Sequence, residues 1–247
     1  MSDGEHRLDR PSRDKADING RLATSLPCML PALLFDLDGT VVDSIELIMT
    51  SMRHAFVGHP GGAPSDEEWR TLIGRPLIDS FREFVTDEPE IARLVGRYRE
   101  HQLEHHDRLV RPYEGVVDAI LGFAAAGHPM ALVTSKADWL ATRALVHVGL
   151  EVAIPVVVGC DSCTRHKPHP EPVERALALL RMAPADAIFV GDSPHDIKAG
   201  RAAGVHTIGV SWGAFSRDEL AKAGADEVIH EVGALTRAVR CFVTRDS

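Results

Sequence analysis

The chain has 247 residues, with 27 lysines and arginines against 36 aspartates and glutamates, so its formal net charge is −9. This acidic balance argues against nucleic acid or an anionic membrane surface as the main partner, because both require a basic face. Hydrophobic residues make up 45% and charged residues 26% of the sequence, which is typical of a globular protein. The length predicts one core domain with a smaller domain inserted or appended.

The sequence suggests neither a membrane span nor a targeting segment. The longest apolar run near the start, residues 27–35, is far shorter than the ~18 residues that a transmembrane helix needs. The first 26 residues mix acidic and basic side chains, unlike a signal peptide, so we expect residues 1–30 to form a disordered tail. The cysteines are too few and too scattered for a disulfide framework, which makes a reducing cytoplasm the expected location. They are Cys28, Cys160, Cys163 and Cys241.

Short apolar runs recur along the chain, and each is followed by a helical pattern. Runs without polar alternation are expected where strands are buried on both faces of a parallel sheet. The expected strands are 32–35, 130–133, 155–158, 187–190 and 207–210, and the expected crossover helices are 115–126, 138–148, 170–182 and 195–203. This alternation predicts a doubly wound, Rossmann-like α/β core with a parallel sheet.

More than 90 residues separate the first two expected strands, far more than a simple crossover requires. The pattern between them is helical and is interrupted at residues 59–64 and at Gly74-Arg75-Pro76. These breakers leave helices near 44–57, 66–73, 77–85 and 88–107. We therefore expect residues 44–108 to form an inserted, all-helical cap domain, and residues 31–43 and 109–247 to form the core.

Ligands of open α/β sheets bind outside the carboxyl ends of the strands, so the residues after each strand are the candidates for function. The first strand is followed by Asp36 and Asp38, two carboxylates two residues apart, and then by Gly39, which lets the chain turn. The second strand is followed by Thr134-Ser135-Lys136, whose hydroxyl and backbone N–H groups suit a phosphate oxygen. A serine or threonine before a helix is also a common N-cap.

The later strand ends add a lysine and two more acids. Lys167 precedes the helix that begins near residue 170, and Asp192 and Asp196 follow the fourth strand. Taken singly, the lysine is typical of a surface charge and the acids are typical of helix N-caps. Together, however, the strand ends supply up to four carboxylates at one sheet edge. A hard divalent cation would offset that acidic cluster, and Mg²⁺ is the expected ion.

These four motifs, in this order and on these elements, resemble those of the haloacid dehalogenase-like (HAD) hydrolase superfamily. The resemblance covers residues 32–235, and the helical insertion resembles the C1 cap of these enzymes. The segments 35–44 and 190–193, and the later Gly224-Ala225-Asp226, look like the phosphoglycolate phosphatase-like subgroup. The resemblance implies a Mg²⁺-dependent phosphatase that acts on a small phosphomonoester.

The resemblance also implies a role for each motif residue. Asp36 would attack phosphorus and form an aspartyl phosphate, and it needs no base because a carboxylate is already ionised at neutral pH. Asp38 would protonate the leaving oxygen and then activate water. Dehalogenases lack an acid at this position, which favours a phosphate ester. Thr134 and the backbone at Ser135 would hold phosphoryl oxygens, and Lys167 would offset negative charge.

Two metal sites have to be weighed. By resemblance, Mg²⁺ would be held by the carboxylates of Asp36 and Asp192 and by the backbone carbonyl of Asp38. Asp196 would either bind the ion directly or contact a group that binds it. Cysteine and histidine also recur at every third residue around the lysine motif, a spacing that can bind zinc. Such short gaps leave little room for a tetrahedral cage that also delivers the lysine, so ordinary loop residues are favoured. The four residues are Cys160, Cys163, His166 and His169.

The cap is expected to select the substrate, because it closes over the sheet edge and excludes water. Arg75 could pair with a substrate carboxylate or a second phosphate, and a solvated turn arginine is the alternative. The first candidate substrate is 2-phosphoglycolate, while inorganic pyrophosphate, nucleoside monophosphates and sugar phosphates remain open. A phosphosugar mutase and a catalytically silent binding module are less favoured. The partner is thus a small phosphorylated metabolite, and the sequence does not distinguish a monomer from a homodimer.

Overall fold

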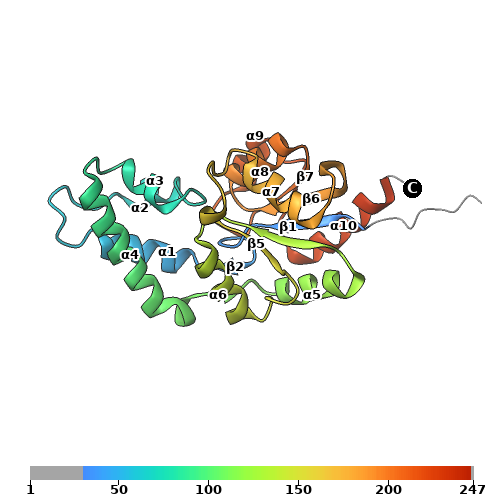
Figure 1. The fold of residues 1–247 in the computed structure, drawn as a ribbon, viewed down its shortest axis with the longest axis horizontal. Helices are drawn as coiled ribbons and strands as arrows, with labels where there is room; N and C mark the ends of the chain where they lie inside the picture. Colours follow the sequence, from blue (N-terminus) through green and yellow to red (C-terminus); the bar gives the residue numbers. More distant parts are fainter. Residues whose placement is uncertain (1–29, 246–247) are drawn as a thin grey trace, which may run out of the picture.

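The computed structural model describes residues 30–245, and the expected tail lies outside that range except for Leu30. Six parallel strands form one sheet with helices on both faces and a helical lobe at one end (Figure 1). The strand order is β5-β4-β1-β6-β7-β8. The strands are β1 Ala32–Phe35, β4 Met130–Val133, β5 Val156–Val158, β6 Ala187–Gly191, β7 His206–Val210 and β8 Glu227–Ile229. The predicted doubly wound α/β fold is therefore confirmed.

Strand β1 lies in the middle of the sheet because both of its edges are paired. Leu33 is in register with Met130 of β4 on one side and with Ile188 of β6 on the other. All four residues of β1 are buried, as its uninterrupted apolar run predicts. The chain adds β4 and β5 beyond one edge of β1 and β6, β7 and β8 beyond the other. The strand order thus reverses at β1, which is where open α/β sheets bind their ligands.

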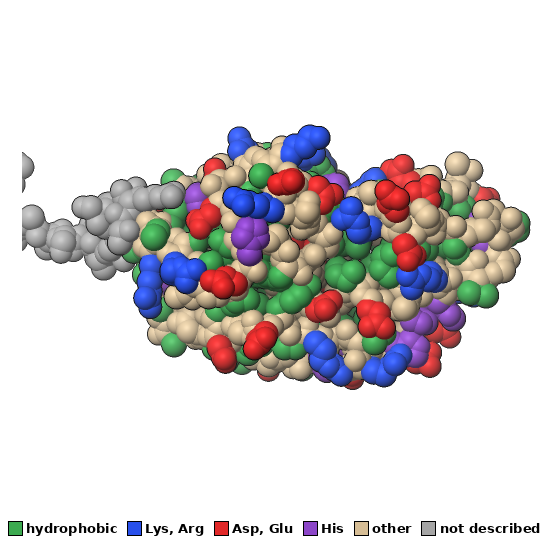
Figure 2. All heavy atoms as spheres, turned by 180° about the vertical axis from the view of Figure 1, so that it is seen from behind, with side chains coloured by type: hydrophobic (Ala, Val, Ile, Leu, Met, Phe, Trp, Pro, Cys, Tyr) green, Lys and Arg blue, Asp and Glu red, His purple; other side chains and the backbone are tan. Residues whose placement is uncertain are grey.

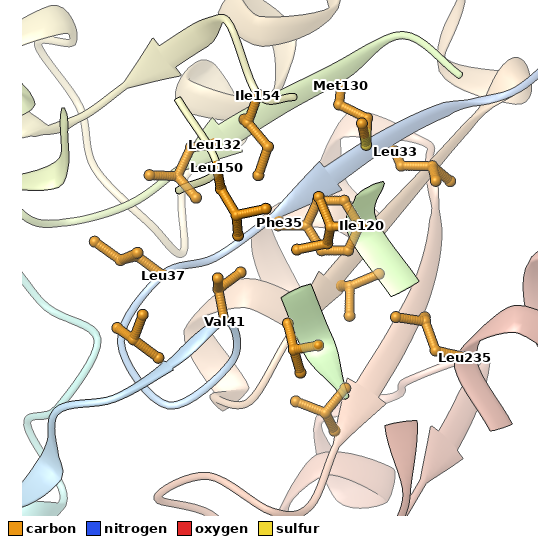
Figure 3. Packing of buried hydrophobic residues seen from close by; sticks show 14 of the residues in the cluster. Leu33, Phe35, Leu37, Val41, Ile120, Met130, Leu132, Leu150, Ile154 and Leu235 are labelled. Carbon is orange, nitrogen blue, oxygen red and sulfur yellow. The ribbon is translucent and has the colours of Figure 1, made fainter. Parts of the chain in front are cut away.

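Alternate residues of β1 point to opposite faces of the sheet, and different helices cover each face. The covering helices are α5 Val116–Ala126, α6 Asp138–Val148 and α10 Val232–Arg245 on the first face, and α7 Glu171–Leu180, α8 Pro194–Ala203 and α9 Arg217–Ala223 on the second (Figure 1). Leu33 and Phe35 belong to one cluster with residues of α5, α6 and α10, whereas Ala32 and Leu34 pack with residues of α7 and α8. Figure 3 shows part of the first cluster, including Ile120 of α5 and Leu235 of α10. Burial of apolar side chains on both faces is the main stabilising contribution in such a sheet.

The helical lobe, called the cap from here on, consists of four helices between β1 and β4. They are α1 Ile45–Ala55, α2 Asp66–Arg70, α3 Leu77–Arg82 and α4 Glu88–Leu109. The centre of the cap is aromatic, and the rings of Trp69 and Phe81 lie 5.2 Å apart between centroids. The chain enters and leaves through β2 Val42–Asp43 and β3 Arg111–Pro112, which pair antiparallel. The two connections therefore lie side by side, while the domain boundaries at residues 44 and 108 stay a prediction.

The cap is packed against the core through the turn after α2. Ile73 is buried in this turn against Ile197 of α8, against Phe215, which precedes α9, and against Leu220 of α9. Arg70 adds a polar contact, because its Nη1 donates to the backbone oxygen of Ala214 at 2.8 Å. These contacts bring the cap over the carboxyl ends of the central strands.

The elements differ from the predicted ones in a few places. Helices α2 and α3 each end three residues before the predicted helices do, because turns follow them that bury Ile73 and Val85. Strand β8 and helices α9 and α10 were not predicted individually. None of the described helices is long and apolar enough to cross a membrane. On the face shown in Figure 2, acidic and basic side chains are interspersed, so this face has no extended region of one charge.

Candidate active site

Three predicted site residues meet because they follow neighbouring strands. Asp36 follows β1, Thr134 follows β4 and Asp192 follows β6, and all three are buried. The backbone continues the sheet pairing for one residue beyond two of these strands. The N–H of Asp36 donates to the carbonyl of Val190, and that of Thr134 donates to the carbonyl of Val158, each at 2.9 Å. The parallel sheet thus positions two of these residues rigidly at its carboxyl edge.

Lys167 reaches the same edge from the loop between the short helix η1 (Cys160–Ser162) and α7. Its Nζ donates to Asp36 Oδ1 at 2.7 Å, to Asp196 Oδ1 at 2.6 Å and to the carbonyl of Val133 at 3.1 Å. Three acceptors match the three N–H bonds of the ammonium. Burial alone would lower the pKa of Lys167, but the carboxylates of Asp196 and Asp36 raise it above its ordinary value. The side chain is only 1% exposed, so the alternative of a solvated surface lysine is wrong.

Asp196 both caps a helix and belongs to the site. It lies in the first turn of α8, where its Oδ2 accepts from the N–H of Ser193 at 3.0 Å and from the Ser193 hydroxyl at 2.6 Å. The hydroxyl of Ser193 in turn accepts from the N–H of Asp196, which completes a capping box. The other carboxylate oxygen remains for Lys167. Helix capping therefore fixes the carboxylate that faces the lysine.

Asp192 is held in place behind Gly39. Its Oδ1 accepts from the hydroxyl of Thr40 at 3.2 Å, and its Oδ2 accepts from the N–H of Ala214 at 2.8 Å. Gly39 has a φ of +84°, and a Cβ at this position would lie 2.2 Å from Asp192 Oδ2. Only glycine leaves room for this carboxylate and adopts this backbone conformation without strain.

The acids form a cluster that fits a divalent cation. Asp36, Asp192 and Asp196 each place a carboxylate oxygen within 4.8 Å of the others. When all three acids are ionised, three carboxylates and the ammonium of Lys167 leave two net negative charges in a buried site. An all-oxygen donor set of this charge suits a hard cation. Burial raises the pKa of Asp36 to about 7, and burial with repulsion from Asp36 and Asp196 raises the pKa of Asp192 well above its ordinary value.

Asp38 is held by two donors and does not belong to the acid cluster through its side chain. Its Oδ1 accepts from the hydroxyl of Ser44 at 2.5 Å and from Lys136 Nζ at 2.7 Å. Sequence reasoning assigned no role to Lys136 or Ser44. The only signal for Lys136 was its position directly after Thr134 and Ser135, and the only signal for Ser44 was its place at the end of the motif segment 35–44. The ammonium and the hydroxyl together hold this carboxylate in one position.

A cavity of about 360 Å³ lies between the cap and these strand ends. Its size is at the lower end of the range of about 300–1,000 Å³ that is usual for small-molecule sites. The core contributes mainly charged and polar groups, and the cap contributes apolar and aromatic groups together with three arginines. Among the lining residues are Asp36, Asp38, Thr134 and Ser135 from the core and Trp69, Leu77 and Tyr98 from the cap. The strand-end carboxylates of Asp36 and Asp38 thus line a small space, which Asp79 and Asp161 also line.

Arg75 and Ser135 both lie at this cavity, and each already has a protein partner. Arg75 Nη1 is 2.9 Å from Glu83 Oε1, so a substrate anion would have to compete with that carboxylate. The alternative of a solvated turn arginine is also incomplete, since the side chain is 28% exposed. The hydroxyl of Ser135 donates to the carbonyl of Gly74 at 2.6 Å and so links the core to the same cap turn.

The cysteines and histidines around Lys167 do not come together as metal ligands. Within residues 30–245, two clusters of three potential ligand atoms occur, and neither contains any of these four residues. His169 Nδ1 instead accepts from the backbone N–H of Glu171 at 3.1 Å. The zinc alternative therefore has no geometric support at Cys160, Cys163, His166 and His169.

The fold and the acid-lined cavity define an enzyme of the hydrolase class. The haloacid dehalogenase-like hydrolase family matches residues 33–210, and the chain belongs to that family. The chain is 36% identical over 200 residues to the pyrophosphatase PpaX of Halalkalibacterium halodurans, a match that covers 81% of this chain and 92% of the relative. Relatives of this kind identify the chain as a phosphatase and confirm the superfamily expected from the motifs.

Solved structures agree with this assignment. A predicted phosphatase from Clostridium acetobutylicum superposes with a TM-score of 0.77 at 25% identity, covering 86% of this chain and 99% of its own. A predicted phosphoglycolate phosphatase from Haemophilus somnus also gives a TM-score of 0.77, at 23% identity, covering 85% of this chain and 98% of its own. At 23% identity, the similarity to the Haemophilus somnus structure concerns the fold alone.

Proposed function

We propose that this protein is a Mg²⁺-dependent phosphatase that releases phosphate from a small phosphorylated metabolite through an aspartyl phosphate. One observation carries the proposal. The Asp36 carboxylate lies at the junction of the acid cluster, the buried ammonium of Lys167 and a small cavity that Asp38 also lines. A nucleophile, a charge-neutralising group and a proton donor are the parts that phosphoryl transfer requires.

The two aspartates divide the chemistry. An Asp36 carboxylate oxygen attacks phosphorus, the bond from phosphorus to the leaving oxygen breaks, and Asp38 gives its proton to that oxygen. In the second step Asp38 takes a proton from water, the water oxygen attacks phosphorus, and the Asp36 carboxylate is released. The contacts of Asp38 with Ser44 and Lys136 support this role, because they hold its carboxylate at the cavity.

The remaining residues bind the metal ion and the phosphoryl group and neutralise negative charge. Asp36, Asp192 and Asp196, with the backbone carbonyl of Asp38, would hold Mg²⁺, which when bound neutralises charge on the phosphoryl oxygens. Lys167 offsets the negative charge of the nucleophile and the phosphoryl group. The Thr134 hydroxyl and the backbone N–H of Ser135 would hold phosphoryl oxygens. The deficit of positive charge around the three buried carboxylates supports this assignment.

Two substrates have specific support. The curated relatives at about one-third identity are named pyrophosphatases, which favours inorganic pyrophosphate. The subgroup motifs and the cationic cap residues favour 2-phosphoglycolate, whose carboxylate is also a second anion. Nucleotides and sugar phosphates are further members of the same class. We place the reaction in the cytoplasm, with neither nucleic acid nor a membrane as a partner.

The test is phosphate release from pyrophosphate, 2-phosphoglycolate, nucleoside monophosphates and sugar phosphates, with Mg²⁺ and again with EDTA. We expect metal-dependent release that strongly favours one compound. The second arm compares Asp36→Asn with Asp118→Asn, which makes the same chemical change at an exposed position on α5. Asp36→Asn should lose activity by several orders of magnitude while the protein stays folded, whereas Asp118→Asn should keep its activity. Substantial turnover by Asp36→Asn would contradict the nucleophile assignment.

A further inference from the structure

The cationic side chains that line the cavity are not equivalent, because most of them are already paired with acids. Arg75 is paired with Glu83 at 2.9 Å and Lys136 with Asp38 at 2.7 Å. The other two lining cations are Arg82, whose Nε is 3.1 Å from Glu88 Oε1, and Arg99. Within residues 30–245, the guanidinium of Arg99 makes no hydrogen bond and no ion pair. Among the described residues it is therefore the lining cation without an acid partner.

Arg99 stands on the face of α4 that forms the cap wall of the cavity. Tyr98 and Gln102, which are buried, line the same cavity one position before it and three after it. Arg99 itself is half-buried. Cys160 of η1, in the core, lines the same cavity as Arg99 of the cap. Burial raises the pKa of the Cys160 thiol to about 11, and the positive charge of Arg99 acts weakly against this rise.

A half-buried guanidinium without an acid partner has lost part of its hydration and has gained no ion pair in return. An anion that enters the cavity can supply that missing partner, and a carboxylate or phosphate can accept from the guanidinium through two parallel hydrogen bonds. Next to it, the Tyr98 hydroxyl accepts from Gln102 Nε2 at 3.1 Å, which leaves its own proton available to donate. The cap wall of the cavity therefore offers donors from α4, whereas Asp36 and Thr134 belong to the core wall of the same cavity.

We propose that Arg99 binds a second anionic group of the substrate, a phosphate or a carboxylate carried by the leaving group. The inference rests on the proposed phosphatase function and narrows its substrate class to doubly anionic phosphates, such as pyrophosphate and 2-phosphoglycolate. It also separates two arginines of the cap. Arg75 is the residue that the turn motif suggests, but its partner Glu83 occupies it, whereas Arg99 has no sequence motif and is available.

Kinetics of Arg99→Gln test the proposal. The matched control is Arg108→Gln, which removes the same charge from an exposed position on the same helix and outside the cavity. We expect Arg99→Gln to lower kcat/KM for pyrophosphate or 2-phosphoglycolate by about 10- to 100-fold, the range for a lost charge-assisted contact. The loss for p-nitrophenyl phosphate, whose leaving group is neutral before cleavage, should be at least five-fold smaller. Equal losses for both kinds of substrate would overturn the proposal.

A binding measurement separates this inference from the proposed function. Calorimetric titration with imidodiphosphate, which carries two phosphoryl groups, is compared with titration with orthophosphate. Arg99→Gln should weaken imidodiphosphate binding about ten-fold or more and orthophosphate binding much less. Unchanged imidodiphosphate affinity refutes the role of Arg99 even if the wild type is an active phosphatase. Absence of phosphate release by the wild type, with imidodiphosphate binding that depends on Arg99, refutes only the proposed reaction.

Discussion

Replacement of Gly39 by alanine should displace the carboxylate of Asp192, because the added Cβ would clash with it. Gly39 has a φ of +84°, and the new Cβ would lie 2.2 Å from Oδ2, 2.6 Å from Cγ and 2.9 Å from Oδ1 of Asp192. These contacts are shorter than any real Cβ tolerates, so one of the two groups must move. The Asp192 carboxylate is the group that can rotate. Its rotation would break the 2.8 Å hydrogen bond that the N–H of Ala214 donates to Asp192 Oδ2.

The expected cost has two parts. An alanine held at a left-handed φ costs about 1–2 kcal/mol. Loss of the hydrogen bond between Ala214 and the Asp192 carboxylate adds about 1.5–3 kcal/mol, because one partner is charged. We therefore expect Gly39→Ala to lower the free energy of unfolding by about 2.5–5 kcal/mol. Metal affinity should fall with it, since the displaced carboxylate is one of the three acids of the cluster.

Gly149→Ala is the matched control. Gly149 has a φ of +73° at the end of α6, and a Cβ there would meet nothing within 4 Å. It should therefore cost only the backbone part, about 1–2 kcal/mol. Urea unfolding in EDTA measures the free energy of unfolding of both variants, and calorimetric titration measures their affinity for Mg²⁺. Equal losses of stability in the two variants, or a wild-type Mg²⁺ affinity in Gly39→Ala, would refute the reasoning.

Three further variants test other parts of the structure. Asp38→Asn should lower kcat by about 10²–10⁴-fold while Mg²⁺ affinity in calorimetry stays near wild type, and a lost affinity would reassign its side chain to the metal. Trp69→Ala, which empties the aromatic centre of the cap, should cost about 3–5 kcal/mol in urea unfolding, and a loss below about 1 kcal/mol would contradict its packing role. Burial would raise the pKa of Asp226, but hydrogen bonds from the Thr207 hydroxyl and N–H lower it. Asp226→Asn should therefore reduce the urea midpoint at pH 7, and the difference should shrink as the pH falls from about 4 through the lowered pKa of Asp226; a difference that stays constant or grows as the pH falls would contradict this sign.

The sheet and its active edge could be predicted because their signals are local. Uninterrupted apolar runs identify strands buried on both faces, and the polar residues that end those runs must lie at one edge of a parallel sheet. Asp36, Thr134 and Asp192 follow directly from this geometry. Their roles as nucleophile, phosphate ligand and metal ligand stay predictions that the proposed experiments test.

The amino-acid sequence by itself determined the doubly wound core, the helical insertion, the family and the strand-end residues, since each depends on local periodicity or a short motif. Only the tertiary structure decided which charges are paired. Lys136 contacts Asp38 across 98 positions of sequence, Arg75 is paired with Glu83, and within residues 30–245 the guanidinium of Arg99 has no acid partner. No pattern along the chain encodes these outcomes, because the electrostatic partner of a side chain depends on which segments the fold places around it.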